Sequence, residues 1–223
     1  MSEPSAHTEH YDADYFAWQR EWGEFGAWAS FPLFASFVRP TDRVIDFGCG
    51  GGYLLEALPG SEKIGIEVNA VAREAAAARG LDLRPSPADV PDGWADVLVS
   101  NHALEHCAHP LGELEALLPK VRPGGRVVFV VPAEAARRAY DATDHNRHLY
   151  TWSALNLGHL FDEAGFEVQS SREIVHRWPP QAQTLARVGG RRLFDAVSTL
   201  YGYLRRSTSQ VRVVARRPAA ETD

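Results

Sequence analysis

Residues 43–52 read Arg-Val-Ile-Asp-Phe-Gly-Cys-Gly-Gly-Gly, and this stretch decides the fold. The apolar segment at 43–47 predicts a short buried strand, and residues 53–58 predict the start of a helix. The glycines between them let the backbone turn tightly and approach a ligand closely. The free N–H groups at the start of the following helix can bind a carboxylate or a phosphate. This order of strand, glycine loop and helix predicts a site for a nucleotide-like ligand.

Strands and helices alternate along the rest of the chain. Apolar segments predict strands at 63–67, 81–83, 95–100, 126–131, 166–174 and 210–215. Further segments predict helices at 70–79, 111–121 and 152–164. This alternation is typical of a mainly parallel sheet covered by helices on both faces. In such sheets ligands bind beyond the carboxyl ends of the strands, where the strand order reverses.

The composition argues against several classes of protein. A formal net charge of −6 gives no broad basic surface for nucleic acid. The only cysteines, Cys49 and Cys107, do not make a disulfide framework. The first ten residues are polar and lack the apolar core of a signal peptide, and no apolar run is long enough to span a bilayer. We therefore expect a soluble, cytoplasmic protein that does not bind nucleic acid.

Two acidic residues favour one class of ligand for the glycine loop. Glu67 ends the next strand, where a carboxylate can accept hydrogen bonds from two ribose hydroxyls. A dinucleotide loop reads G-x-G-x-x-G, but the third glycine position here is Tyr53. The buried carboxylate of Asp46 repels a pyrophosphate and attracts an ammonium group. S-adenosylmethionine carries both an amino acid end and a ribose, so the local chemistry favours it over a dinucleotide.

Several motifs resemble those of class I S-adenosylmethionine-dependent methyltransferases, and of their small-molecule branch in particular. They lie at 44–55, 64–69, 96–106, 118–125 and 163–166, so the resemblance spans about residues 40–175. It implies an α/β, Rossmann-like, doubly wound sheet of seven strands with the last strand antiparallel. We expect one domain over 1–223, divided into an N-terminal helical cap (11–40), a cofactor-binding core (41–175), a helical insertion (176–209) and the last strand (210–216).

The resemblance also implies roles for single residues in holding S-adenosylmethionine. Asp46 acts on the methionine amino group, Glu67 holds the ribose hydroxyls and Val68 lies under the adenine. Asn101 offers its backbone carbonyl near the amino group. Many relatives place an aspartate after the third strand to contact adenine, and here Ser86 or Asp89 takes that place. The expected cofactor-binding residues are Asp46, Gly48, Cys49, Gly50, Glu67, Val68, Ser86, Asn101 and His102.

The acceptor side requires a base if a hydroxyl is methylated, and histidine suits this role near neutral pH. His148 is the preferred base, with His145 and Asp144 as orienting or alternative groups in the loop after the fifth strand. His106 lies in a motif common to the whole family, so we read it as structural or cofactor-side. Asp144, His145 and His148 also suit a divalent metal, although no third strong ligand is evident and we predict no metal. The alternative that residues 144–150 only cap the helix predicted at 152–164 stays open.

Two segments outside the core bear on the acceptor. Residues 11–38 contain ten aromatic side chains, more than one helix face can bury, so some of them are expected to line a pocket. Residues 181–206 combine apolar and arginine residues and are divided by Gly189-Gly190. An ordinary surface helix, peripheral membrane contact and a homodimer contact all fit this basic stretch. Together the two segments can form a lid over the acceptor.

These observations predict methyl transfer from S-adenosylmethionine to a small-molecule acceptor, at a hydroxyl of a sugar, a lipid-linked molecule or a secondary metabolite. The product is S-adenosylhomocysteine. Two alternatives from other classes stay open: a nicotinamide-dependent oxidoreductase, and a non-catalytic relative that binds the cofactor as a sensor or partner module.

Overall fold

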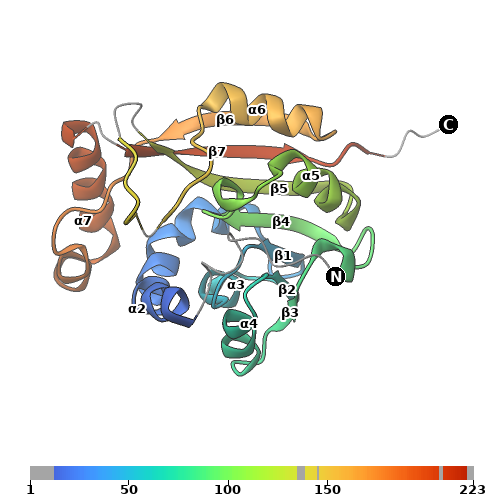
Figure 1. The fold of residues 1–223 in the computed structure, drawn as a ribbon, viewed down its shortest axis with the longest axis horizontal. Coiled ribbons are helices and arrows are strands. Elements are labelled where there is room, and N and C mark those ends of the chain that lie inside the picture. Colours follow the sequence, from blue (N-terminus) through green and yellow to red (C-terminus); the bar gives the residue numbers. More distant parts are fainter. Residues whose placement is uncertain (1–12, 135–138, 145, 206–207, 220–223) are drawn as a thin grey trace.

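A seven-stranded sheet forms the centre of the molecule (Figure 1). The computed structural model describes residues 13–134, 139–144, 146–205 and 208–219. Its strands run in the order β3-β2-β1-β4-β5-β7-β6. The bounds are β1 Arg43–Phe47, β2 Glu62–Ile66, β3 Asp82–Arg84, β4 Ala95–Asn101, β5 Val121–Glu134, β6 Glu167–Ile174 and β7 Thr208–Arg216. Strands β1 to β5 pair in parallel, and β7 is antiparallel to both of its neighbours. The predicted Rossmann-like sheet is confirmed.

Helices cover both faces of this sheet and one end of it. Their bounds are α2 Ala13–Ser30, α3 Tyr53–Ala57, α4 Ala70–Ala77, α5 Pro110–Leu117, α6 Ala154–Glu163 and α7 Ala182–Arg205. Short 3-10 turns follow α2 (η1 Phe31–Leu33 and η2 Ala35–Phe37), β3 (η3 Pro87–Asp89), β4 (η4 Leu104–His106) and α5 (η5 Leu118–Lys120). In Figure 1, α5 and α6 lie on one side of the strands, α2, α3 and α4 lie on the other, and α7 lies at the edge of the molecule.

The strands bury both faces because apolar side chains alternate between two cores. Ile45, Leu98 and Phe129 pack with α5 and α6 in one core. Their chain neighbours Val44 and Val97 pack in the other, against α3 and the turns after α2. Successive side chains of a strand point to opposite faces, so a strand covered on both sides must be apolar at nearly every position.

The position of the site follows from the strand order. β1 and β4 are neighbours in the sheet although β2 and β3 lie between them in the chain, so the order reverses there. The Ser100 hydroxyl donates a hydrogen bond to the Phe47 carbonyl at 2.8 Å and ties the ends of the two strands together. The loops after β1 and β4 therefore diverge at one edge of the sheet, and a crevice opens between them.

Some predicted bounds were wrong. The helix expected over 111–121 ends at Leu117, and Val121 already belongs to β5. The strand expected over 126–131 extends to Glu134, because β7 pairs antiparallel with it along its whole second half. The expected division of 181–206 is present, since Gly190 has φ 64° and ψ −173° inside α7. Within the described residues, no helix combines the length and the apolar character that crossing a bilayer requires.

Candidate functional site

Two cavities meet at the carboxyl ends of β1 and β4. The first, of about 740 Å³, lies between the ends of β1 to β4 and α5, and Glu67 and Val68 are among its lining residues. The second, of about 590 Å³, lies against α2 and the loops that follow β5 and β6. Gly48, His102 and His106 line both of them. The cavities therefore share a wall, and one elongated ligand can reach from the first into the second.

The glycine loop between β1 and α3 has a left-handed backbone at alternate residues. The φ angles of Gly48, Gly50 and Gly52 are +68°, +52° and +74°, a conformation that residues with a Cβ adopt only at a cost. A Cβ on Gly48 would lie 2.2 Å from the Cβ of Ala103, in the loop after β4. The Gly48 N–H donates to the carbonyl of Ile66 at 2.8 Å, which fastens the loop to the end of β2. Glycine is thus required here both by the backbone angles and by the close approach of two loops.

Asp46 places a buried carboxyl group beneath this loop, at the wall of the second cavity. Its exposed fraction is 2%. Burial, and secondly the negative charge of Glu67, raises its pKa to about 8. No hydrogen bond from the described part of the chain reaches its carboxyl oxygens. A ligand that brings a positive charge stabilises the ionised form of such a buried carboxyl group.

Glu67 stands on the other side of the loop, just beyond the end of β2. Its Oε2 accepts a hydrogen bond from the Gly50 N–H at 2.8 Å, and its Oε1 accepts one from the Asn69 N–H at 2.8 Å. Burial raises the pKa of Glu67, and these two hydrogen bonds oppose the rise. Each carboxylate oxygen keeps a second lone pair for a ligand hydroxyl. The two backbone contacts hold the side chain in one orientation toward the first cavity.

The far end of the first cavity offers apolar surface with few polar groups. The Val68 side chain is 66% exposed there. Ser86 also lines the cavity, and its hydroxyl accepts a hydrogen bond from the Ala88 N–H at 3.1 Å at the start of η3. Asp89 is exposed and is not among the residues that line either cavity. Of the two residues considered for the adenine contact, Ser86 lines the first cavity and Asp89 does not.

Cys49, Asn101 and His102 also line the second cavity, and His102 lines the first as well. Burial raises the pKa of Cys49 well above its ordinary value, so it is a thiol at neutral pH. The buried Oδ1 of Asn101 accepts no hydrogen bond from the described residues. The backbone of His102 is left-handed, with φ +56°. Its side chain is 35% exposed and lines both cavities. Burial, helped by the charge of His148, lowers the pKa of His102 to about 4, so it is neutral at pH 7.

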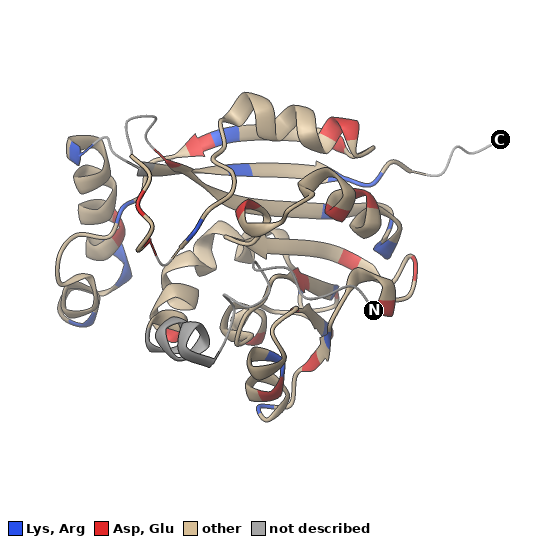
Figure 2. Cartoon of the chain, viewed as in Figure 1, with Lys and Arg blue, Asp and Glu red and all other residues tan. Residues whose placement is uncertain are grey.

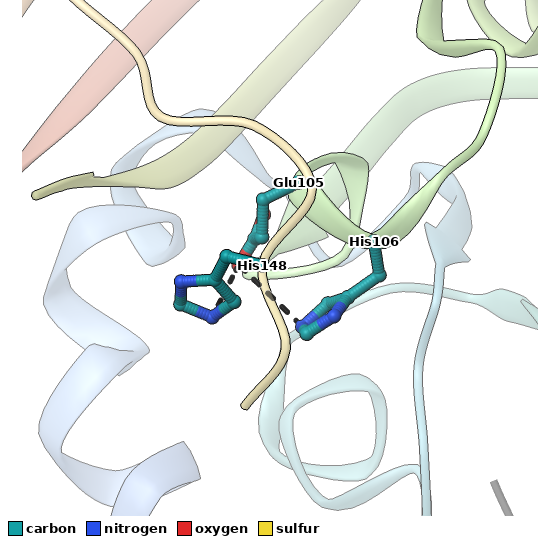
Figure 3. A group of neighbouring side chains, drawn as sticks. All are labelled: Glu105, His106 and His148. Carbon is teal, nitrogen blue, oxygen red and sulfur yellow. Dashed lines mark ion pairs between the residues drawn. The ribbon is translucent and has the colours of Figure 1, made fainter. Parts of the chain in front are cut away.

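Imidazole groups surround the buried carboxyl of Glu105 on the acceptor side, and Figure 3 shows two of them. Glu105 Oε1 lies 3.6 Å from His102 Nδ1, 3.9 Å from His106 Nε2 and 3.9 Å from His148 Nε2. Neither carboxyl oxygen accepts a hydrogen bond from the described residues. Burial, and to a lesser degree the charge of Glu134, raises the pKa of Glu105 to about 8. Glu105 therefore carries its proton in most molecules at pH 7.

A second carboxylate orients His148. Glu134, at the end of β5, has its Oε1 3.0 Å from His148 Nδ1. This contact assigns the ring proton to Nδ1 and leaves Nε2 as the acceptor nitrogen. The N–H groups of Leu149 and Tyr150 donate to the Glu105 carbonyl at 2.9 and 3.3 Å and fix the loop that carries His148. His148 and Glu134 both line the second cavity, so the pair can take a proton from a molecule bound there.

Asp144, a second member of the predicted acceptor group, is not part of this arrangement. Asp144 accepts a hydrogen bond from the Asn146 N–H at 3.2 Å within its own loop, and it lines neither cavity. His145 lies outside the described residues. Of the predicted group of three, only His148 is seen to face the second cavity.

Comparison with known proteins agrees with this geometry. A family model described as a methyltransferase domain matches residues 17–171. The chain belongs to the class I S-adenosylmethionine-dependent methyltransferases. This assignment decides against the alternative of a nicotinamide-dependent oxidoreductase.

Curated relatives of this methyltransferase differ in the acceptor that their names imply. It is 34% identical over 111 residues to the ubiquinone biosynthesis O-methyltransferase of Aeromonas salmonicida. The matched residues make up 44% of this chain and 46% of that protein. It is 33% identical over 101 residues to the ribosomal protein L11 methyltransferase of Ralstonia nicotianae. There the matched residues make up 41% of this chain and 33% of that protein. The chain thus spans half or less of the length of these two relatives.

Among solved structures, the methyltransferase resembles the [4+2]-cyclase SpnF, with a TM-score of 0.63 and 19% identity over 91% of this chain and 83% of that one. At this identity the likeness concerns the fold alone. A cyclase and a methyltransferase domain share the architecture, so the reaction has to be argued from the residues of the site.

Three residues on the acceptor side of the methyltransferase also have the composition of a metal site. Glu105, His106 and His148 offer ligand atoms that all lie within 4.8 Å of one another (Figure 3). A carboxylate and two imidazoles suit several divalent ions. This set differs from the one considered from sequence, in which Asp144 and His145 stood with His148.

Glu105 and Glu134 were missed by the sequence reasoning, and His106 was read only as structural or cofactor-side. Glu105 lies in the same motif as His106, and only its burial among imidazoles gives it a chemical role. Glu134 was overlooked because the predicted strand ended at 131. A polar residue at the end of a buried strand, on the ligand edge of the sheet, was the signal available for it.

Proposed function

We propose that this methyltransferase binds S-adenosylmethionine across the two cavities and transfers its methyl group to a small-molecule acceptor, at a hydroxyl group. The observation that carries the proposal is the left-handed glycine loop held between the buried carboxyl group of Asp46 and the half-buried one of Glu67. When bound, the cofactor supplies an electrophilic methyl group on a positively charged sulfur. The residues of the chain bind it, align the acceptor and move one proton.

Asp46 and Glu67 hold the two polar ends of the donor in this proposal. The Asp46 carboxyl group has a raised pKa and no hydrogen-bonding partner in the described chain, and an ammonium group supplies both charge and donors. Glu67 is oriented by two backbone N–H groups and accepts the ribose hydroxyls with its remaining lone pairs. Val68 offers apolar surface to the adenine ring, and Ser86 lies beside it in the first cavity.

His148 acts as the general base for the acceptor hydroxyl. Its Nδ1 is held by Glu134, so its Nε2 is the nitrogen that accepts the proton. Glu134 then stabilises the imidazolium that forms, as a carboxylate beside a histidine does in other enzymes. Glu105, on the other side of the ring, carries its own proton at pH 7 and so does not compete for this role.

The walls of the second cavity favour an aromatic or otherwise flat acceptor with a negative charge. Trp22 and Trp178 line it from α2 and from the loop before α7. Arg177 also lines it, and the buried Nη1 of Arg177 has no hydrogen-bonding partner among the described residues. A buried donor without a partner is costly, so an acceptor that brings an anionic group is favoured.

Titration of S-adenosylhomocysteine by calorimetry tests the donor half of the proposal. We expect one-site binding by the wild-type chain and binding at least about tenfold weaker in Glu67→Gln, since one acceptor of the ribose becomes a donor. Glu62→Gln changes an exposed residue at the start of β2, the strand that precedes Glu67, and serves as the matched control. Well-folded wild-type protein that does not bind the ligand would refute the assignment.

A panel of hydroxybenzoates with tritiated methyl donor tests the acceptor half. We expect His148→Gln to lower kcat by about a hundredfold or more, with S-adenosylhomocysteine affinity changed less than about twofold. His159→Gln, at an exposed position on α6, is the matched control and is expected to keep full activity. Tight cofactor binding without methyl transfer to this panel or to sugar and lipid-linked hydroxyls would favour the non-catalytic alternative instead.

A further inference from the structure

The outer surface of α7 combines exposed apolar side chains with arginine. We call it the α7 surface, and it consists of Arg187, Val188, Arg192, Leu193, Leu200, Tyr203, Leu204 and Arg205. Val188 is 85% exposed, Leu200 60% and Leu204 73%. Single exposed apolar residues are ordinary on a protein surface, but five large ones on one helical element are not.

The second half of α7 is amphipathic. Phe194, Ser198 and Gly202 recur at every fourth position, are buried, and form the inner face of the second half of α7. Leu193 and Leu200 are seven residues, or about two turns, apart on the opposite side. The kink at Gly190 separates this half from the first half, which carries Arg187 and Val188. The inner face is held by packing, so the outer face is free to meet a partner.

The packing of the inner face is extensive. The Phe194 ring contacts Phe25 and Trp28 of α2, with ring centroids 5.6 and 5.1 Å apart. The Arg191 guanidinium lies over the Trp28 ring, 3.6 Å from its centroid, and also donates to the Trp28 carbonyl. These contacts fasten the second half of α7 to α2 and set the direction in which its outer face points.

The charge of this surface is opposite to that of the chain. The chain has a formal net charge of −6, yet α7 carries three exposed arginines and a single acidic residue. The one acidic residue of α7, Asp195, has a side chain that is 40% exposed, and it lies 3.5 Å from His176 and 4.0 Å from Arg191. Figure 2 shows the arginines of α7 at the edge of the molecule, whereas most acidic residues lie elsewhere on the fold.

The loop that precedes α7 lines the second cavity. The loop that leads into α7 contributes His176, Arg177 and Trp178 to the lining of that cavity. The Trp178 ring packs edge-on against Phe25, 4.9 Å between centroids, in the same cluster that holds Phe194. A surface on which α7 docks would therefore lie close to the entrance through which an acceptor reaches His148.

We propose that the α7 surface docks on an anionic lipid bilayer, with its leucines in the interfacial region and its arginines against the headgroups. Amphipathic helices with apolar and arginine residues bind such surfaces through both effects, and each basic residue adds to the affinity. A second copy of the chain fits less well. A symmetric contact centred on α7 would bring the arginines of both copies together, and the single acid of α7, Asp195, already lies beside His176 and Arg191. The proposal is independent of the reaction catalysed.

Flotation of the full chain with vesicles tests the proposal. We expect binding to vesicles of equal parts phosphatidylcholine and phosphatidylglycerol, at least about tenfold weaker binding to phosphatidylcholine alone, and a loss of binding as the salt concentration rises. The double variant Arg187→Gln/Arg192→Gln is expected to weaken partitioning about 25-fold, since each basic residue contributes about fivefold. Leu200→Glu/Leu204→Glu is expected to weaken it by at least about tenfold.

Leu155→Glu is the matched control, because Leu155 is 69% exposed on α6, away from α7. It is expected to partition within about twofold of the wild type. Thermal melts and S-adenosylhomocysteine titration of every variant separate a failure to fold, or a failure of the proposed function, from a failure to dock. Absence of vesicle binding, or an equal loss in Leu155→Glu, would overturn the proposal. So would a concentration-dependent dimer that Leu200→Glu/Leu204→Glu abolishes while vesicles are not bound.

Discussion

We expect the Asp46 carboxyl group to make the binding of the donor depend on pH. In the free protein its pKa is raised to about 8 by burial and by the charge of Glu67, so it is mostly protonated at pH 7. An ammonium group placed beside it favours the carboxylate, so the bound protein has given up that proton. The group must therefore be ionised when the ligand binds, and this ionisation costs free energy whenever the pH lies below about 8.

The magnitude follows from the pKa of the free state. One pH unit below the pKa, ionisation costs about 1.4 kcal/mol, and two units below it costs about 2.7 kcal/mol. The sign is fixed because the free protein holds the proton more tightly than the bound protein does. Affinity for S-adenosylhomocysteine therefore rises with pH, by about tenfold from pH 6 to pH 7. Nearly one proton is released for each ligand bound in this range.

Calorimetry at several pH values, in buffers of different ionisation enthalpy, measures both the affinity and the proton release. We expect Asp46→Asn to lose the pH dependence and the proton release together, because asparagine does not titrate. Asp82→Asn, at an exposed position on β3, is the matched control and is expected to keep both. A wild-type affinity that does not change between pH 6 and pH 7, or a slope that survives in Asp46→Asn, would refute the reasoning.

Three further outcomes are expected. Gly48→Ala places a Cβ 2.2 Å from that of Ala103 at φ +68°, so we expect urea unfolding to show a loss of at least about 2 kcal/mol, with weaker cofactor binding. Phe194→Ala removes a fully buried ring and is expected to cost about 3–5 kcal/mol, whereas Val188→Ala, at an exposed position of α7, stays within about 0.5 kcal/mol. Prolonged dialysis against EDTA is expected to leave methyl transfer unchanged, because the proposed proton transfer needs His148 Nε2 free of metal; a rate that falls and is restored by a divalent ion contradicts that role.

The cofactor side of the protein was largely predictable from local sequence. A strand, a glycine loop and a helix are encoded in contiguous residues, and the left-handed angles at Gly48, Gly50 and Gly52 leave glycine as the favoured choice. Glu67 could be placed because parallel strands bring their carboxyl ends to one edge of the sheet. The remaining errors at the ends of elements arose where strand pairing lengthened β5 and shortened the preceding helix.

The acceptor side depends on contacts between segments far apart in the chain. Glu105 follows β4, Glu134 ends β5 and His148 lies in the loop beyond it, and nothing in their spacing says that they meet. Sequence alone therefore determined a doubly wound sheet with a donor loop, since backbone angles and apolar alternation are local properties. Only the tertiary structure decided which imidazole is held by a carboxylate, which carboxyl group is buried with a raised pKa and which face of α7 stays uncovered. Those properties depend on the burial and charge that distant segments bring to each group.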